Sequence, residues 1–138
     1  MWILYGLLAG ITAALMTIAA KIGLKTVDPT FATAIRSVFM AGYMLLVVSA
    51  TGKWTPLSSL DARGWRWIAL AAALGAASWL FYFLGLQAGT ATRLAALDRL
   101  SLPLIVLLSF VLLHEVPTTK GIIGAVITTV GILLMTIK

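Results

Sequence analysis

The chain has 138 residues, the size of one small domain. Hydrophobic residues make up 62% of it and charged residues 10%, whereas a typical soluble domain has about 45–50% and about 25%. A soluble fold of this size cannot bury so much apolar surface, so the composition excludes a soluble domain and indicates lipid as the solvent. The net charge of +6 does not predict nucleic-acid binding, because the basic residues are scattered singly between apolar runs.

Five apolar runs follow one another along the chain, each close to the length that a helix needs to cross the hydrocarbon core. They cover Trp2–Ala20, Phe31–Ala50, Trp67–Leu86, Leu94–Leu113 and Gly121–Ile137. Lipid offers the backbone no hydrogen bonds, which favours helices, and the runs lack the alternation of a β-barrel. The sequence therefore predicts an all-α membrane protein, a bundle of five transmembrane helices in one domain over residues 1–138. The first run is too long for a signal peptide and follows no Lys or Arg.

The first two runs carry the first candidate polar positions. Small residues share one face of the first helix with a lysine, at Gly6, Gly10, Ala13, Thr17 and Lys21. Such a face permits close helix contact or leaves space for a cavity. Asp28–Pro29 is expected to end the first connection. In the second run Arg36 lies near the helix end, where its side chain can reach towards the interface.

The second connection and the third run are rich in aromatic residues. Thr51–Arg66 combines tryptophans with basic residues, which suits the headgroup layer. In the third helix one face holds Ala71, Gly75, Ser78, Tyr82 and Gly85, with Trp79 beside them. Aromatic side chains with a polar tip either pack in the bundle or line a substrate path, and both alternatives stay open here.

The fourth run places charge inside the membrane. Leu102–Leu113 has 12 residues, about 18 Å of helix, so the span must extend back through Asp98 and Arg99 to cross a core of about 30 Å. A charge at that depth costs about 2.5–3.5 kcal/mol on insertion scales and usually faces a partner or a water-filled path. We expect Asp98 to pair with Arg36, or else with Lys21. The pair is either structural or part of a transport path.

Pro103 adds a kink to the same run. Proline lacks an N–H and clashes with the carbonyl four residues back, which is that of Arg99. A kink with a freed carbonyl beside a charged pair is typical of transporter sites near the midplane.

The connections carry no clear topogenic charge bias. Lys21, Lys25, Arg93 and Lys138 fall on one face of the membrane, and Lys53, Arg63, Arg66 and Lys120 fall on the other. Four against four gives no positive-inside preference, which predicts insertion in both orientations and pairing with an inverted copy. A small-residue face in the last helix is the candidate contact between chains, at Gly121, Gly124, Thr128 and Gly131.

Enzyme chemistry is nearly absent from the sequence. His114–Glu115 lacks the second histidine of a zinc helix, no serine lies in a nucleophile elbow, and no glycine-rich loop precedes a lysine. There is no cysteine, which excludes disulfides and thiolate metal sites. We therefore expect neither an enzyme nor a cofactor or metal.

Three stretches resemble a known family: Pro29–Arg36 with its Pro and later Arg, Trp79–Arg93 with its aromatic helix and Leu-x-x-Gly turn, and His114–Gly131 with its Glu turn and Gly-Ala…Gly helix. Together they resemble a single EamA domain of the drug/metabolite transporter superfamily. The segment Ala96–Ser101 is similar to that of the half-size, five-helix members. His114 departs from the family, which commonly has glycine there.

The resemblance implies a transporter that works by alternating access. Larger members carry two such domains as inverted repeats and export amino acids and other metabolites, so a single domain would form an antiparallel homodimer. The superfamily's small multidrug branch has a glutamate in its first helix, which this chain lacks. We expect a multi-pass protein of a bacterial inner membrane that exports a small anionic or zwitterionic metabolite.

The expected transport path contains a set of basic, acidic, aromatic and kink residues: Lys21, Arg36, Trp79, Tyr82, Asp98, Arg99 and Pro103. Lys21, Arg36 and Arg99 make it basic, which favours anionic or zwitterionic substrates over lipophilic cations. The alternatives are a multidrug or lipid-headgroup exporter of the same fold, or an accessory subunit that does not transport.

Overall fold

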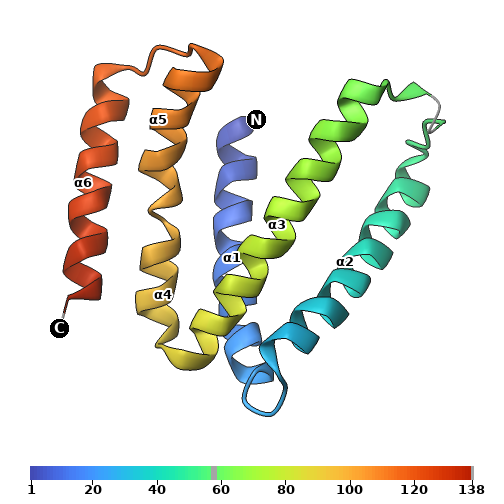
Figure 1. Ribbon diagram of the computed structural model, residues 1–138, viewed down its shortest axis with the longest axis horizontal. Coiled ribbons are helices and arrows are strands. Elements are labelled where there is room, and N and C mark those ends of the chain that lie inside the picture. The colour runs from blue at the N-terminus through green and yellow to red at the C-terminus, as the bar shows by residue number, and fades with distance from the viewer. Residues whose placement is uncertain (57–58, 138) are drawn as a thin grey trace. The chain divides into compact units, whose positions relative to one another are not determined.

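The computed structural model describes residues 1–56 and 59–137, and its regular structure over them is helical. The helices are α1 (Trp2–Gly23), α2 (Pro29–Thr51), α3 (Ala62–Ala88), α4 (Ala91–Asp98), α5 (Ser101–Leu113) and α6 (Thr119–Thr136) (Figure 1). Within these residues five stretches are long and apolar enough to cross a membrane: α1, α2, α3, α4 together with α5, and α6. The predicted all-α fold with five spans is confirmed.

Local capping sets where the helices begin and end. The Asp28 carboxylate accepts hydrogen bonds from the backbone N–H groups of Thr30 and Phe31, at 2.8 and 3.0 Å, so α2 begins at Pro29, which has no N–H to satisfy. The same helix is capped at Gly52, whose φ of 64° suits glycine. At α6 the Thr118 hydroxyl accepts from the Gly121 N–H at 3.1 Å. The expected end of the first connection at Asp28–Pro29 agrees with this start of α2, and α2 and α6 each begin two residues before the predicted Phe31 and Gly121.

The third span begins five residues earlier than the predicted Trp67. The Asp61 carboxylate accepts a hydrogen bond from the Gly64 N–H at 2.7 Å, so that α3 begins at Ala62. Arg63 and the residues after it are therefore helical rather than part of the connection. The capping aspartate was present in the sequence, but the apolar pattern begins only after it.

The fourth span is two helices where one kinked helix was predicted. Around the break, the N–H of Arg99 bonds to the Ala96 carbonyl at 3.0 Å and that of Leu100 to the Leu97 carbonyl at 2.9 Å, which are three-residue steps. Pro103 has no N–H to give to the Arg99 carbonyl, and the Leu102 N–H bonds to it instead, at 3.0 Å. The expectation that this carbonyl is freed is therefore wrong, because the tightened turn supplies a donor.

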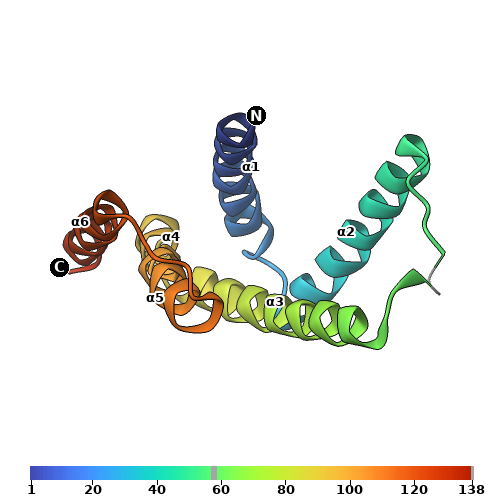
Figure 2. The ribbon, with the colours of Figure 1, turned by 90° about the horizontal axis from the view of Figure 1, so that it is seen from above.

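The chain divides into two compact units. The first unit comprises Met1–Ile18 and Ala88–Lys138. In it α6 lies alongside α4 and α5 (Figures 1 and 2). The second unit is Ala19–Gln87 and contains the end of α1, all of α2 and most of α3. It holds most of the buried side chains of the chain, namely Leu24, Pro29, Thr33, Tyr82, Phe83 and Leu86.

Eight hydroxyl groups within the spans bond to their own helices. In each case the side chain donates to the backbone carbonyl four residues earlier, at distances between 2.7 and 3.0 Å: Thr12, Thr17, Thr33, Ser37, Ser49, Thr51, Thr129 and Thr136. The donors are thus satisfied without a partner helix, as a lipid environment requires. Many large apolar side chains of the spans are exposed.

Candidate functional site

A cation packed on aromatic rings lies inside the second unit. The ζ carbon of Arg36, on α2, is 3.7 Å from the centroid of the Trp79 ring on α3 and 5.8 Å from that of Phe83. A guanidinium over an aromatic face is attracted by the negative centre of the ring, and the attraction grows when both groups leave water. We call Arg36, Trp79, Tyr82 and Phe83 the cation–aromatic cluster.

Helical spacing explains how the sequence assembles this cluster. Trp79, Tyr82 and Phe83 are related by steps of three and four residues, so one face of α3 presents all three rings. The Trp79 ring meets Tyr82 edge-on at 5.5 Å between centroids and Phe83 at 6.0 Å. Phe83 was not among the predicted site residues, although its position four residues after Trp79 was a signal for it.

The cluster lies where the packed end of the second unit gives way to its exposed part. Pro29 is fully buried and Phe83 is only 4% exposed, whereas Arg36 is half-buried. One and two turns further along α2, Met40 and Tyr43 are exposed, the latter by 65%. Arg36 comes seven residues after the start of α2, so its Cα lies about 10 Å along the helix axis.

Lys21 belongs to the same unit and makes a different contact. Its ammonium donates a hydrogen bond to the backbone carbonyl of Leu86. That carbonyl is in the last turn of α3, where carbonyl groups lack partners within the helix and carry its negative dipole end. The structure thus gives Lys21 the role of a C-terminal cap that joins the end of α1 to α3, and its place in a transport path stays a prediction.

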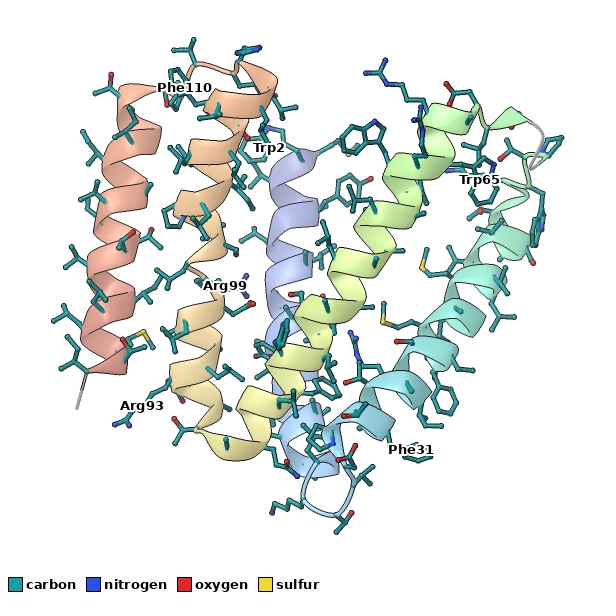
Figure 3. All side chains as sticks on the ribbon, viewed as in Figure 1. Trp2, Phe31, Trp65, Arg93, Arg99 and Phe110 are labelled. Atoms are coloured by element: carbon teal, nitrogen blue, oxygen red, sulfur yellow. The ribbon has the colours of Figure 1, made fainter. Side chains whose placement is uncertain are left out.

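The other predicted path residues lie in the first unit, at the break between α4 and α5. Asp98 is the last residue of α4, Arg99 caps it, and both are exposed, while Pro103 is half-buried in α5. Figure 3 shows Arg99 at the break and Arg93 near the start of α4. The predicted pairing of Asp98 with Arg36 stays a prediction.

The small-residue face of α6 is divided between two environments. Thr128 and Gly131 are half-buried, whereas Gly121 and Gly124 are exposed. A Cβ added at Gly124 or Gly131 would meet nothing within 4 Å, and one at Gly121 would lie 3.2 Å from the Thr118 hydroxyl. Contacts within the described chain therefore do not require glycine at positions 124 and 131, and the predicted dimer interface stays a prediction.

His114 ends α5 with a left-handed φ of 55°, the conformation that favours glycine. This is the position where the resembled family commonly has glycine.

A shallow cavity of about 280 Å³ lies at the start of α3 in the second unit, and it is lined by Arg63, Arg66, Trp67 and Leu70. Lys138, which entered the charge comparison, lies outside the described residues.

Comparison with known proteins places the chain in a family. The model of the EamA-like transporter family matches residues 1–137. An uncharacterized transporter in the cobO 3' region of a Sinorhizobium species is 34% identical over 136 residues, which are 99% of this chain and 96% of that protein. No solved structure matches the chain. Because the family match takes in all five spans, this multi-pass membrane protein belongs to the EamA-like transporter family.

Proposed function

We propose that the protein exports a small anionic or zwitterionic metabolite, such as an amino acid or an organic acid, by alternating access in an antiparallel homodimer. The observation that carries this proposal is the cation–aromatic cluster, in which Arg36 is held over Trp79 inside an apolar span. A charge at such depth is costly and usually serves a substrate path or a partner.

The chemistry of the cluster favours an anion as its ligand. An aromatic face and a carbonyl oxygen are uncharged, so the contacts of Arg36 with Trp79 and of Lys21 with Leu86 contribute no negative charge. A guanidinium has five N–H donors in a planar fork that matches a carboxylate. The rings are occupied by the protein's own cation, which disfavours their use as a cage for a cationic drug.

The balance of basic residues between the two predicted faces supports the proposed antiparallel dimer. One chain supplies five spans, an odd number that places its two ends on opposite sides. A second copy in the inverted orientation would restore a twofold axis in the membrane plane, as in transporters built from inverted repeats. A bacterial inner membrane suits the bacterial source of the related transporter.

Flux measurements on purified protein in liposomes test the substrate class. We expect uptake of labelled amino acids or organic acids and none of tetraethylammonium. Arg36→Gln should remove the flux, while Arg66→Gln, an exposed arginine of α3, should keep it. Flux of quaternary cations alone would support the multidrug alternative, and flux of lipid headgroups the lipid exporter. Absence of any flux would support the accessory subunit.

Cysteine labelling tests the dual insertion. The chain has no cysteine, so a single cysteine placed at either end reports without a background. We expect each end to be labelled in part from outside whole cells. Complete labelling of one end with none of the other would contradict the proposal of two orientations.

A further inference from the structure

The Trp79 ring sets the position of the Arg36 guanidinium. At 3.7 Å from the ring centroid, the ζ carbon is in van der Waals contact with the indole. An arginine side chain is otherwise long and has many rotamers, and ordering it is unfavourable in entropy. Because the Trp79 ring already orders the Arg36 side chain, less side-chain entropy is lost when a ligand binds.

The ring itself is held by the core of the second unit. Tyr82 and Phe83 meet it edge-on, with interplanar angles of 70° and 89°, and both are buried. Edge-to-face geometry is the favourable arrangement for aromatic pairs. A chain of contacts therefore leads from the buried end of α3 through Trp79 to Arg36.

The space beside the cluster is open on one side. Gly75 lies one turn before Trp79 on α3, and an added Cβ there would meet nothing within 4 Å. Met40, one turn after Arg36 on α2, is exposed. The exposed part of the unit therefore offers a small ligand a way to the guanidinium, while the buried Phe83 ring lies 5.8 Å from the ζ carbon of Arg36.

We propose that Trp79 is a positioning residue, which presents the N–H edge of Arg36 to the carboxylate of the transported metabolite. This inference rests on the proposed function and deepens it by naming the recognised group. The ring contacts the ζ carbon, and the N–H bonds lie around the edge of the guanidinium plane, where a carboxylate accepts two of them in parallel. Lysine lacks this fork and this stacking face, so it cannot replace Arg36.

Protection of Arg36 from phenylglyoxal, followed by mass spectrometry, tests this role on the purified full chain. We expect succinate and L-alanine to slow the modification of Arg36 but not that of Arg63, and tetraethylammonium to slow neither. In Trp79→Leu the half-protecting concentration of the carboxylates should rise about tenfold, the scale of a desolvated cation–π contact. Trp79→Phe, which keeps an aromatic face, should restore most of the protection.

The controls separate positioning from folding and from transport. Trp67→Leu removes a tryptophan of the same helix that is 61% exposed, and its protection curve should match that of the unmodified protein. Trp79→Leu should also raise the KM for carboxylate flux more than it lowers the maximal rate. An unchanged half-protecting concentration in a folded Trp79→Leu protein would overturn the inference even if flux persists. Protection without any flux would instead contradict the proposed function and leave the positioning role in place.

Discussion

The two units place charge inside apolar spans in opposite ways. In the second unit Arg36 lies within a regular helix, and its neighbours are rings from the facing helix. In the first unit Asp98 and Arg99 lie where one helix ends before the next begins, and both are exposed. An arginine within a regular helix has to find neighbours on another helix, whereas residues at this helix break lie beside backbone groups that bond in three-residue steps. The first charge thus has aromatic neighbours within its unit, whereas the second pair of charges lies at an exposed helix break.

The largest expected effect on stability concerns the predicted ion pair between Asp98 of the first unit and Arg36 of the second. If Asp98 pairs with Arg36, Asp98→Asn or Arg36→Gln alone should lower the free energy of unfolding by about 3–5 kcal/mol, because each strands one charge in a low-dielectric site. The double variant strands none and should recover much of the loss. Melting temperatures in detergent give the coupling energy. Additive losses would show that the two residues do not meet, and Lys21 would become the next partner to test.

The double variant also separates structure from transport. If the pair is only structural, Asp98→Asn with Arg36→Lys, which keeps a cation, should lose stability while Asp98→Asn with Arg36→Gln stays folded. If Asp98 takes up and releases a proton during the cycle, the fraction of Asp98→Asn protein that stays folded should be inactive in flux.

The exposed face of α6 provides the next test. Gly124→Leu adds a bulky side chain where the described chain leaves open space, so the monomer should keep its stability. If a second copy packs there, overpacking should weaken the dimer by about 1–3 kcal/mol and remove the crosslinked band in detergent. Gly42→Leu on α2 is the matched control, because that glycine also has open space around it. Loss of the dimer in the control, or its survival in Gly124→Leu, would argue against α6 as the interface.

The break between α4 and α5 depends on Pro103. Pro103→Ala restores an N–H that can bond to the Arg99 carbonyl, and should raise the free energy of unfolding by about 1 kcal/mol. A straighter helix should slow flux if the break belongs to the transport cycle. Pro117→Ala, in the connection before α6, controls for the loss of a proline. Unchanged flux with higher stability would show that the break is not used.

The smallest expected effect concerns the turn after α5. His114→Gly should stabilise the protein by about 1 kcal/mol, since a side chain in the left-handed region carries a penalty of about 1–2 kcal/mol that glycine avoids. His114→Ala keeps a Cβ and should bring no such gain. Equal stability of both variants would mean that surrounding contacts of the imidazole offset the penalty.

Much of the fold can be predicted from the sequence, because a helix in lipid has to satisfy its backbone hydrogen bonds within its own segment. Apolar length predicts the spans, and capping residues such as Asp28 and Thr118 set helix ends through bonds to their nearest neighbours. The break at Arg99 was harder to predict, since proline was expected to bend one helix rather than divide the span. Its cause is the missing N–H of Pro103, which leaves the Arg99 carbonyl to the Leu102 N–H in a tighter turn, and a hydropathy pattern does not represent such a change of donor.

The candidate site was predictable only in part. Arg36 and Trp79 drew attention through charge and helical spacing, yet nothing in the sequence indicated that one lies on the other. Their contact depends on the rotation of α2 and α3 about their axes. Phe83 was missed because a phenylalanine in an apolar run resembles any other lipid-facing residue. Its burial is a property of the packed pair of helices.

The hydroxyl groups that bond back to their own helices have a consequence for insertion into the bilayer. Hydropathy scales treat threonine and serine as polar, because a free hydroxyl group loses its hydrogen bonds to water when it enters an apolar phase. Thr12 and Ser49 are exposed on their spans, but each already donates to a carbonyl one turn earlier. That proton needs no water and is not available to a passing solute. The lipid therefore meets a surface that is more apolar than the residue composition suggests, and these helices should partition into the membrane more readily than their hydropathy indicates.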